Sequence, residues 1–274
     1  MTRLGLIGAG GLSQIVVGAL AQHLRHPLDA LAILVLPEGR EAALRRLDGA
    51  AALARTVSIY EDLPELLAES PDLIVECAGH AAVRLYGAKI LQSGCDLLIS
   101  SVGSLADDGL RQSLENAARA GGSRLLLPAG SVGGVDVLAA ARLSGLRSVA
   151  YTGRKPPRAW MGTPAERLID LSRLAEPAAF FEGTAREAAR DYPQNANVAA
   201  TLALAGIGFD ATRVRLVADP QIDRNVHEIS VESACANFTV ALEGVPSPAN
   251  PKTSLTAGFS LARLILNQTA EVVI

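Results

Sequence analysis

A glycine-rich turn close to the N-terminus constrains the fold of this chain more than any other feature. An apolar run over residues 3–7 leads into the turn, and an amphipathic helical pattern follows over residues 11–24. A strand, a glycine turn and a helix in this order are typical of a dinucleotide-binding domain, whose turn approaches a pyrophosphate. The alternative is a glycine turn in an α/β protein that binds another ligand or none. The residues predicted to contact the cofactor here are Gly8, Gly10, Gly11, Leu12 and Ser13.

Each position in this turn has a physical reason. Gly8 permits the tight turn, and Gly10 lets the backbone approach a phosphate. The third position favours a small residue so that helix and strand pack closely, and Ser13 occupies it in place of glycine. The helix N-terminus then offers amide hydrogens and a partial positive charge to the phosphates.

The first half of the chain alternates short apolar runs with helical patterns. Alternating βα units predict a parallel sheet with helices on both faces. We therefore expect an α/β protein whose N-terminal Rossmann domain, a doubly wound parallel sheet, covers residues 1–135. The predicted strands lie at 3–7, 30–36, 72–77, 96–100 and 124–127, and the predicted helices at 11–24, 81–92 and 105–120.

After about residue 135 the pattern changes. Period-two alternation at 214–218, 227–233 and 237–242 predicts a mainly antiparallel sheet with one covered face. Residues 136–252 are thus expected to form a smaller α+β catalytic domain, followed by a C-terminal segment, 253–274. Further helices are predicted at 136–143, 164–172, 197–205 and 253–267, and a strand at 148–152 that the sequence GRKPP at 153–157 should interrupt.

Composition excludes several classes of protein. A chain of 274 residues with 49% hydrophobic and 19% charged residues can build a sizeable core and is not expected to be disordered. The net charge of −3 and the 4% aromatic content argue against a nucleic-acid partner. Three cysteines without metal-type spacing predict no metal site and fit a reducing compartment. With no expected signal peptide and no apolar window of ~18 residues, we predict a cytoplasmic protein without a membrane partner.

Residues after the predicted strands bear on the choice of cofactor. Glu38 follows the second strand and could bond the ribose of NAD, whereas the nearby Arg40 could meet the 2′-phosphate of NADP; either could simply be a solvated loop residue. We predict NAD first and allow NADP. The turn Ala78, Gly79 and His80 should line the cofactor cleft, because ligands bind outside the carboxyl ends of parallel strands. His80 could approach the nicotinamide, although a helix-capping role is favoured.

Polar residues in the second half are candidates for catalysis and substrate binding. His227 shares strand parity with apolar neighbours, so it is either a general acid or base or a structural histidine. Asn197 either caps a helix or bonds a ligand. Lys155 and the cluster Lys252, Thr253 and Ser254, which precedes or opens the last predicted helix, could bind carboxylates; the alternatives are surface lysines and an N-cap.

Taken together, several segments resemble the L-aspartate dehydrogenase family over essentially the whole chain. The most specific are YPQNANVAA at 192–200 and NVHEI at 225–229, because a generic Rossmann enzyme has no reason to carry them. The other segments are GAGGLS at 8–13, VECAGH at 75–80, LLPAGSVGG at 126–134, TGRKPP at 152–157 and NPKTS at 250–254.

This resemblance implies a reversible oxidative deamination of L-aspartate to oxaloacetate and ammonia through iminoaspartate, with NAD or NADP. It also implies a link to NAD biosynthesis, a homodimer formed through the catalytic-domain sheet, and a C-terminal helix that packs back on the Rossmann domain. His227 falls on the family's catalytic histidine, and Asn197 falls on a cofactor contact. Ser131 falls on a second cofactor contact of the family. That position is commonly alanine, so a contact through the backbone or Cβ is expected. The candidates for the substrate carboxylates are Lys155, Asn197, Lys252, Thr253 and Ser254.

Two alternatives remain open from the sequence. One is a related two-domain dehydrogenase, similar to homoserine dehydrogenase or dihydrodipicolinate reductase, which a panel of substrates would distinguish. The other is a non-catalytic NAD(P)-binding sensor, which would bind cofactor without turnover.

Overall fold

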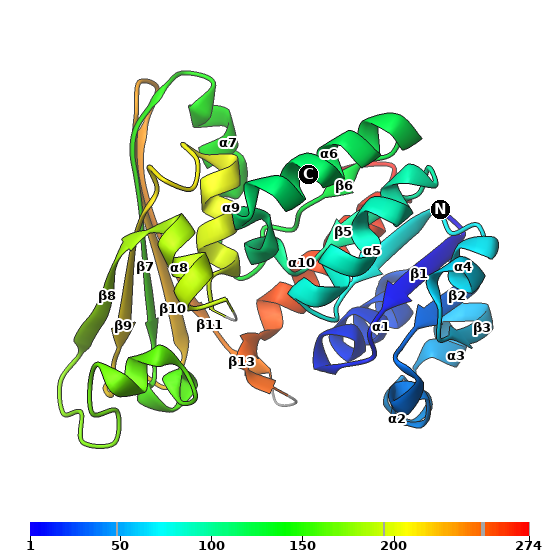
Figure 1. Cartoon of the computed structure of the whole chain (residues 1–274), viewed down its shortest axis with the longest axis horizontal. Coiled ribbons are helices and arrows are strands. Elements are labelled where there is room, and N and C mark those ends of the chain that lie inside the picture. The colour runs from blue at the N-terminus through cyan, green and yellow to red at the C-terminus, as the bar shows by residue number, and fades with distance from the viewer. Residues whose placement is uncertain (48, 194, 248–249, 274) are drawn as a thin grey trace. The chain divides into compact units, whose positions relative to one another are not determined.

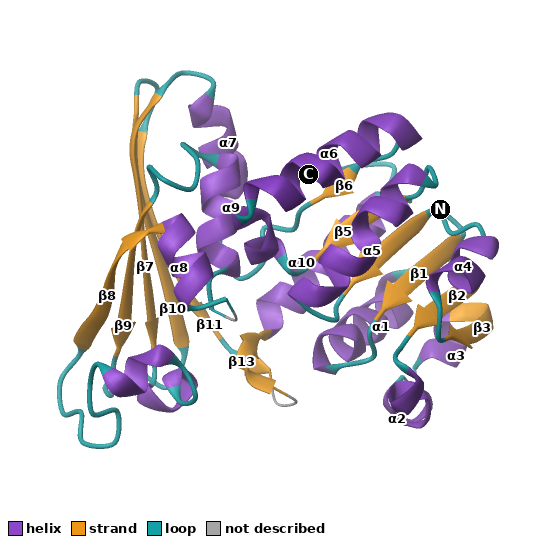
Figure 2. Ribbon diagram, in the orientation of Figure 1, coloured by secondary structure: helices purple, strands orange, loops and turns teal. Residues whose placement is uncertain are grey.

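The computed structural model describes residues 1–47, 49–193, 195–247 and 250–273. The chain divides into two compact units, each with its own strands and helices (Figures 1 and 2). The first unit contains Met1–Pro128 and Ala257–Ile274, and the second contains Ala129–Thr256. None of the helices in the described part of the chain combines the length and apolarity needed to cross a bilayer.

The first unit is built on a parallel sheet of six strands in the order β3-β2-β1-β4-β5-β6. This order is that of a dinucleotide-binding domain, and it confirms the predicted doubly wound sheet. Strand β3 had no sequence signal, because most of its residues are exposed or half-buried at the sheet edge. The strands are β1 (Arg3–Ile7), β2 (Leu28–Leu34), β3 (Ala54–Tyr60), β4 (Leu73–Glu76), β5 (Asp96–Ile99) and β6 (Leu125–Leu126).

Helices cover both faces of this sheet. One face packs α1 (Gly11–His23), α3 (Ala50–Leu53) and α10 (Leu255–Asn267) against the apolar side chains of β1 and β2. Helix α10 comes so close to α1 that a Cβ at Gly258 would lie 2.5 Å from Cγ2 of Ile15. The other face carries α4 (Leu63–Ala68), α5 (His80–Gln92) and α6 (Asp108–Gly121), while α2 (Arg40–Arg46) follows the short 3-10 turn Pro37–Gly39.

The second unit has a sheet of five strands in the order β11-β10-β7-β9-β8. The β7–β9 pair is parallel and the other pairs are antiparallel, so the sheet is mainly antiparallel as predicted. Helices α7 (Val135–Arg142), α8 (Ala185–Asp191) and α9 (Asn197–Ala205) cover one of its faces (Figure 1). The strands are β7 (Leu146–Lys155), β8 (Ala178–Thr184), β9 (Arg213–Ala218), β10 (Asn225–Ser233) and β11 (Asn237–Gly244); a separate pair joins β12 (Pro246–Ser247) to β13 (Asn250–Ser254).

Three local predictions were wrong. Gly153 and Lys155 do not interrupt β7 but complete it, because the strand Leu146–Lys155 contains no proline and its backbone can still pair with β9 and β10. Residues 164–172 form only the 3-10 turn Pro164–Arg167, and Asp170 accepts hydrogen bonds from the backbone and hydroxyl of Ser172, which compete with a helix. The last helix begins at Leu255, since residues 250–254 form β13.

Candidate active site

The glycine turn of the first unit is held tightly against the loop that follows β4. Gly8 has φ of +90°, and a Cβ there would lie 2.9 Å from the Cβ of Ala78. The Ser13 hydroxyl donates a hydrogen bond of 2.7 Å to the Gly8 carbonyl, which ties the first turn of α1 to the strand end. Glycine at position 8 and a small side chain at position 13 are therefore both required by the local geometry.

The same turn fits a dinucleotide. A Cβ at Gly10 would have no atom within 4 Å, so the backbone is open to a ligand at this point. Helix α1 begins at Gly11, and Gly10, as its N-cap, provides no side chain to bond the first amides. Unbonded amides at a helix N-terminus, together with the helix dipole, favour a pyrophosphate.

Glu76, which sequence reasoning missed, organises the neighbouring loops. Its side chain is 1% exposed at the end of β4 and accepts hydrogen bonds from the backbone amides of Ala78 and Gly79, at 2.7 and 2.6 Å. It also accepts from the backbone and the hydroxyl of Ser101, both at 3.1 Å. Its one sequence signal was an acidic residue at the end of an apolar run. Gly79 is the N-cap of α5 and His80 is its first helical residue, so the helix-capping role of His80 stays a prediction.

The two residues considered for cofactor choice differ in their contacts. Glu38 is exposed in the 3-10 turn after β2. The Arg40 guanidinium, in contrast, donates to the Ile59 carbonyl at 3.1 Å and lies 3.4 Å from Glu61. Because Arg40 is already bonded to the end of β3, Glu38 is the freer of the two side chains to meet a ribose.

In the second unit, strand register brings His227 and Lys155 to the same sheet face. His227 on β10 lies directly opposite Gly153 on β7, and Lys155 follows two residues later on the same side of that strand. Both side chains are buried, and Nδ1 of His227 lies 2.8 Å from the Tyr151 hydroxyl. The predicted parity of His227 is therefore correct, whereas Tyr151 was missed because the sequence does not reveal which residues of two strands pair.

Burial controls the charge of both groups. The Lys155 ammonium donates to Asn195 at 2.9 Å and lies 5.2 Å from the ring centre of Trp160. No ion pair is formed by Lys155 among the residues that the structure describes. Burial lowers the pKa of Lys155 to about 8. Burial and the neighbouring Lys155 charge lower the pKa of His227 to about 3, so its imidazole is neutral near pH 7 and can accept a proton.

The remaining predicted residues are spread over three segments of the second unit. Ser131 is buried in the turn before α7, and Asn197 is the first residue of α9, whose N-cap is Ala196. Ser254 is buried at the end of β13 and its hydroxyl accepts from the Thr256 amide, so it acts at the start of α10 as the predicted alternative suggested. The side chains of Lys252 and Thr253 lie outside the described part of the structure.

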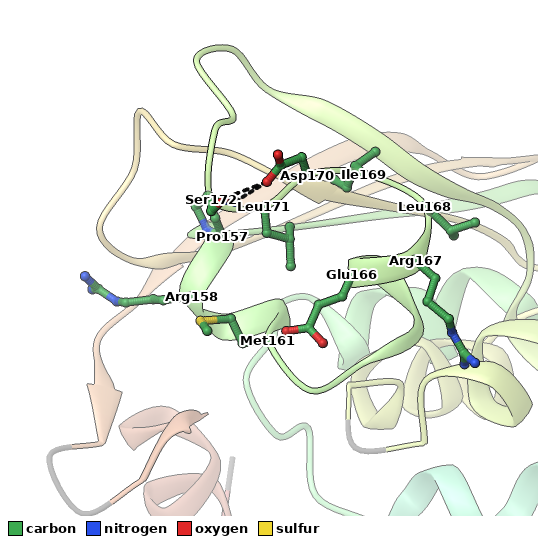
Figure 3. A pocket seen from close by; sticks show the side chains of 10 residues that line it. All are labelled: Pro157, Arg158, Met161, Glu166, Arg167, Leu168, Ile169, Asp170, Leu171 and Ser172. Atoms are coloured by element: carbon green, nitrogen blue, oxygen red, sulfur yellow. Dashed lines mark hydrogen bonds between the residues drawn. The ribbon is translucent and has the colours of Figure 1, made fainter.

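A hollow of about 620 Å³ elsewhere in the second unit contains none of the predicted site residues (Figure 3). Its lining mixes exposed apolar side chains with charges of both signs, and its Asp170 is already bonded to Ser172. We therefore do not assign the chemistry to it. The lining residues are Pro157, Arg158, Met161, Glu166, Arg167, Leu168, Ile169, Asp170, Leu171 and Ser172.

Comparison with known proteins gives consistent matches. The family model described as aspartate dehydrogenase, C-terminal, matches residues 136–268, and that described as homoserine dehydrogenase, NAD binding domain, matches residues 7–128. An L-aspartate dehydrogenase of Pseudomonas aeruginosa is 45% identical, and one of Ralstonia nicotianae is 44% identical, each over 99% of both chains. The crystal structure of aspartate dehydrogenase from Thermotoga maritima has a TM-score of 0.77 at 22% identity, covering 100% of this chain and 99% of that one.

Proposed function

The chain belongs to the L-aspartate dehydrogenase family, and from this premise we propose that it interconverts L-aspartate with oxaloacetate and ammonia through iminoaspartate. The observation that carries the proposal is the pair of buried side chains on one sheet face, a neutral His227 beside a cationic Lys155. The proton acceptor suits a reaction in which the substrate gains and loses protons, and the fixed positive charge suits a substrate with two carboxylates.

The cofactor is NAD or NADP, bound by the first unit. When bound, the cofactor would supply the hydride acceptor for Cα of L-aspartate, and loss of that hydride from the deprotonated amine gives protonated iminoaspartate. The open backbone at Gly10 and the start of α1 support pyrophosphate binding there. The exposed Glu38 supports NAD as the first choice, with NADP allowed. The proposed contacts are Gly8, Gly10, Gly11, Leu12, Ser13, Glu38, Ala78, Gly79, His80, Ser131 and Asn197.

His227 is proposed as the acid and base of the hydrolytic half of the reaction. Water adds to the imine carbon, and the neutral imidazole accepts a proton from it. The imidazolium then gives this proton to the nitrogen of the carbinolamine. As the C–N bond breaks and ammonia leaves, the imidazole accepts the hydroxyl proton, and the carbonyl of oxaloacetate forms. Since Nδ1 of His227 is bonded to Tyr151, the proton is exchanged at Nε2.

Lys155 is proposed to bind a substrate carboxylate. Its ammonium is buried without an ion pair among the described residues, so a bound carboxylate would provide the missing counter-charge. Such a counter-charge would also weaken the effect of Lys155 on His227 and raise the pKa of the imidazole in the complex. Asn197, Lys252, Thr253 and Ser254 remain proposed partners for the substrate.

We also propose a cytoplasmic homodimer whose imino acid supplies NAD biosynthesis. The three free cysteines support a reducing compartment. The edge strand β11, with its alternating exposed residues, supports association through the sheet of the second unit. Sedimentation equilibrium at micromolar concentration tests the dimer, and a monomer there would contradict it.

The test of the activity follows NADH absorbance with oxaloacetate and ammonium, and again without ammonium. Ammonium-dependent oxidation is expected, and NADPH in place of NADH establishes the cofactor. Oxidation without ammonium would instead indicate a 2-hydroxy-acid dehydrogenase. Bound cofactor without turnover would favour a different substrate, such as that of a homoserine dehydrogenase or dihydrodipicolinate reductase, or a sensor.

A further inference from the structure

Tyr151 reaches His227 along a diagonal of the sheet. Its own partner on β10 is Ile229, whereas His227 lies opposite Gly153. The phenol ring therefore leans along its strand by two residues, a separation that aromatic side chains can span. The two rings are almost parallel, with an interplanar angle of 14° and centroids 6.0 Å apart, and Oη lies 2.8 Å from Nδ1.

Gly153 provides the space for this diagonal contact. A Cβ at Gly153 would lie 2.6 Å from Oη and 3.1 Å from Cζ of Tyr151, and 3.3 Å from Cδ2 of Leu216. The phenol is buried among these neighbours, so its hydroxyl cannot move aside and keep its bond to His227. Gly153 does not have a positive φ, so it is the space over the residue, and not the backbone conformation, that requires glycine.

We infer that Tyr151 is a positioning residue for His227, which holds the imidazole with a proton on Nδ1 and a free electron pair on Nε2, and that Gly153 is required for this contact. The inference rests on the proposed role of His227 as acid and base. In this arrangement Nδ1–H donates to Oη both before and after Nε2 accepts a proton. The hydroxyl therefore stays in place through the cycle, and only Nε2 exchanges protons with the substrate.

The chemistry of both groups supports this arrangement. Burial raises the pKa of the Tyr151 hydroxyl, which therefore stays a neutral phenol across the working range of pH. A neutral phenol oxygen accepts a hydrogen bond from Nδ1–H whether the imidazole is neutral or charged. Burial and the nearby cationic Lys155 disfavour a second proton on the ring, and a fixed acceptor at Nδ1 partly offsets that effect when the imidazolium forms.

The kinetic test compares Tyr151→Phe and Gly153→Ala with the wild-type enzyme. Removal of the hydroxyl should lower kcat for oxaloacetate amination by about 10- to 100-fold. The KM for oxaloacetate and the Kd for NADH should change by less than about two-fold, because in the inferred arrangement the hydroxyl bonds His227 and neither ligand. Gly153→Ala keeps the phenol but displaces it, so it should lower kcat in the same direction. Tyr192→Phe is the matched control, since it removes the hydroxyl of a buried tyrosine of the same unit whose ring makes edge contacts with Trp160 and Phe181 and not with His227.

A second measurement does not depend on activity. In ¹⁵N-histidine-labelled protein, the long-range ring couplings of His227, assigned with His227→Ala, report which nitrogen carries the proton. The wild-type enzyme and Tyr192→Phe should show a protonated Nδ1 and a bare Nε2. Tyr151→Phe and Gly153→Ala should both gain the opposite tautomer.

The outcomes separate the two proposals. If wild-type protein fails to turn over oxaloacetate with ammonium, the proposed function is wrong whatever the tautomer. If wild-type protein is active but Tyr151→Phe keeps both its kcat and the tautomer, Tyr151 only fills space and the inference is overturned. A wild-type ring protonated at Nε2 would also overturn it.

Discussion

Glu76 and Lys155 are two buried charged residues that each end a strand, yet their surroundings are opposite. Glu76 ends β4 and accepts four hydrogen bonds from the loops after β4 and β5. Lys155 ends β7 and, among the described residues, donates to the Asn195 side chain and lies over Trp160. The Glu76 carboxylate is satisfied by three backbone amides and the Ser101 hydroxyl, whereas the Lys155 ammonium has N–H donors available for a ligand.

This difference indicates that the buried charge has a different effect on stability in each unit. A buried charge is tolerated where hydrogen bonds replace its hydration, and it destabilises the fold where they do not. The first unit uses its Glu76 carboxylate to fix backbone that we propose faces a cofactor. The second unit keeps the Lys155 ammonium, whose burial lowers stability, beside the neutral His227 imidazole. We expect such an arrangement only where the charge serves the function of the site.

The largest expected effect comes from His227, the group that burial and the neighbouring Lys155 keep neutral. His227→Ala should lower kcat by about 10²- to 10⁴-fold, because the proton acceptor is lost. The Kd for NADH, measured by fluorescence, should stay unchanged if the first unit binds the cofactor by itself. A smaller loss of turnover in a folded variant would remove His227 from the acid–base role and leave Lys155 without its proposed partner.

Lys155→Met tests whether the second charge costs stability. The pKa of Lys155 is about 8 in the fold and 10.5 in its ordinary state, so at pH 7 the bound proton disfavours the folded protein. The variant should therefore be more stable than wild type by roughly 3 kcal/mol at pH 7. Above about pH 8 the folded lysine is neutral. The stability advantage of the variant should then shrink as pH rises towards 10.5, where the unfolded lysine loses its proton too.

Urea unfolding at pH 7 and pH 10 measures this difference, and the KM for L-aspartate measures the functional loss. We expect the more stable variant to bind L-aspartate more weakly. Lys89→Met, at an exposed position of α5, is the matched control and should change neither quantity. A Lys155→Met protein that is less stable than wild type would mean that Asn195 and Trp160 fully compensate the buried charge.

Glu76→Gln should have the opposite effect on stability. The amide presents an N–H₂ group to backbone donors that need an acceptor, so the free energy of unfolding should fall by about 2 kcal/mol. The Kd for NADH should rise, since the loops at Ala78 and Ser101 lose their anchor. If the free energy of unfolding and the Kd for NADH are both unchanged, Glu76 does not stabilise its unit and the contrast with the buried charge of Lys155 does not hold.

The two charges also show what could be predicted from the sequence. The glycine turn, five of the six strands of the parallel sheet and the alternation that buries His227 follow from local patterns, because each depends on residues that are neighbours in the chain. Tyr151, Gly153 and Glu76 have no such signal. Their roles come from strand register and from a loop after a neighbouring strand, which no local pattern specifies.

The extent of β7 illustrates the same limit. Glycine, charged residues and two prolines at 153–157 indicate a break, yet pairing with β9 and β10 carries the strand to Lys155. Tertiary pairing thus overrode a local signal at the point where the site is formed. Asn195 was overlooked for a related reason, since its contact with Lys155 joins residues 40 positions apart.

The smallest expected effect concerns a neutral group in the same unit as Glu76. Ser13→Ala removes a hydroxyl that donates to the Gly8 carbonyl at 2.7 Å but keeps a small side chain. The loss of that bond costs about 1 kcal/mol, and the better helix propensity of alanine offsets about half of it. Urea unfolding should therefore show a decrease well below that of Glu76→Gln. An equal decrease would mean that the glycine turn depends as much on one neutral bond as on the buried carboxylate, and the contrast between charged and neutral anchors in this unit would be lost.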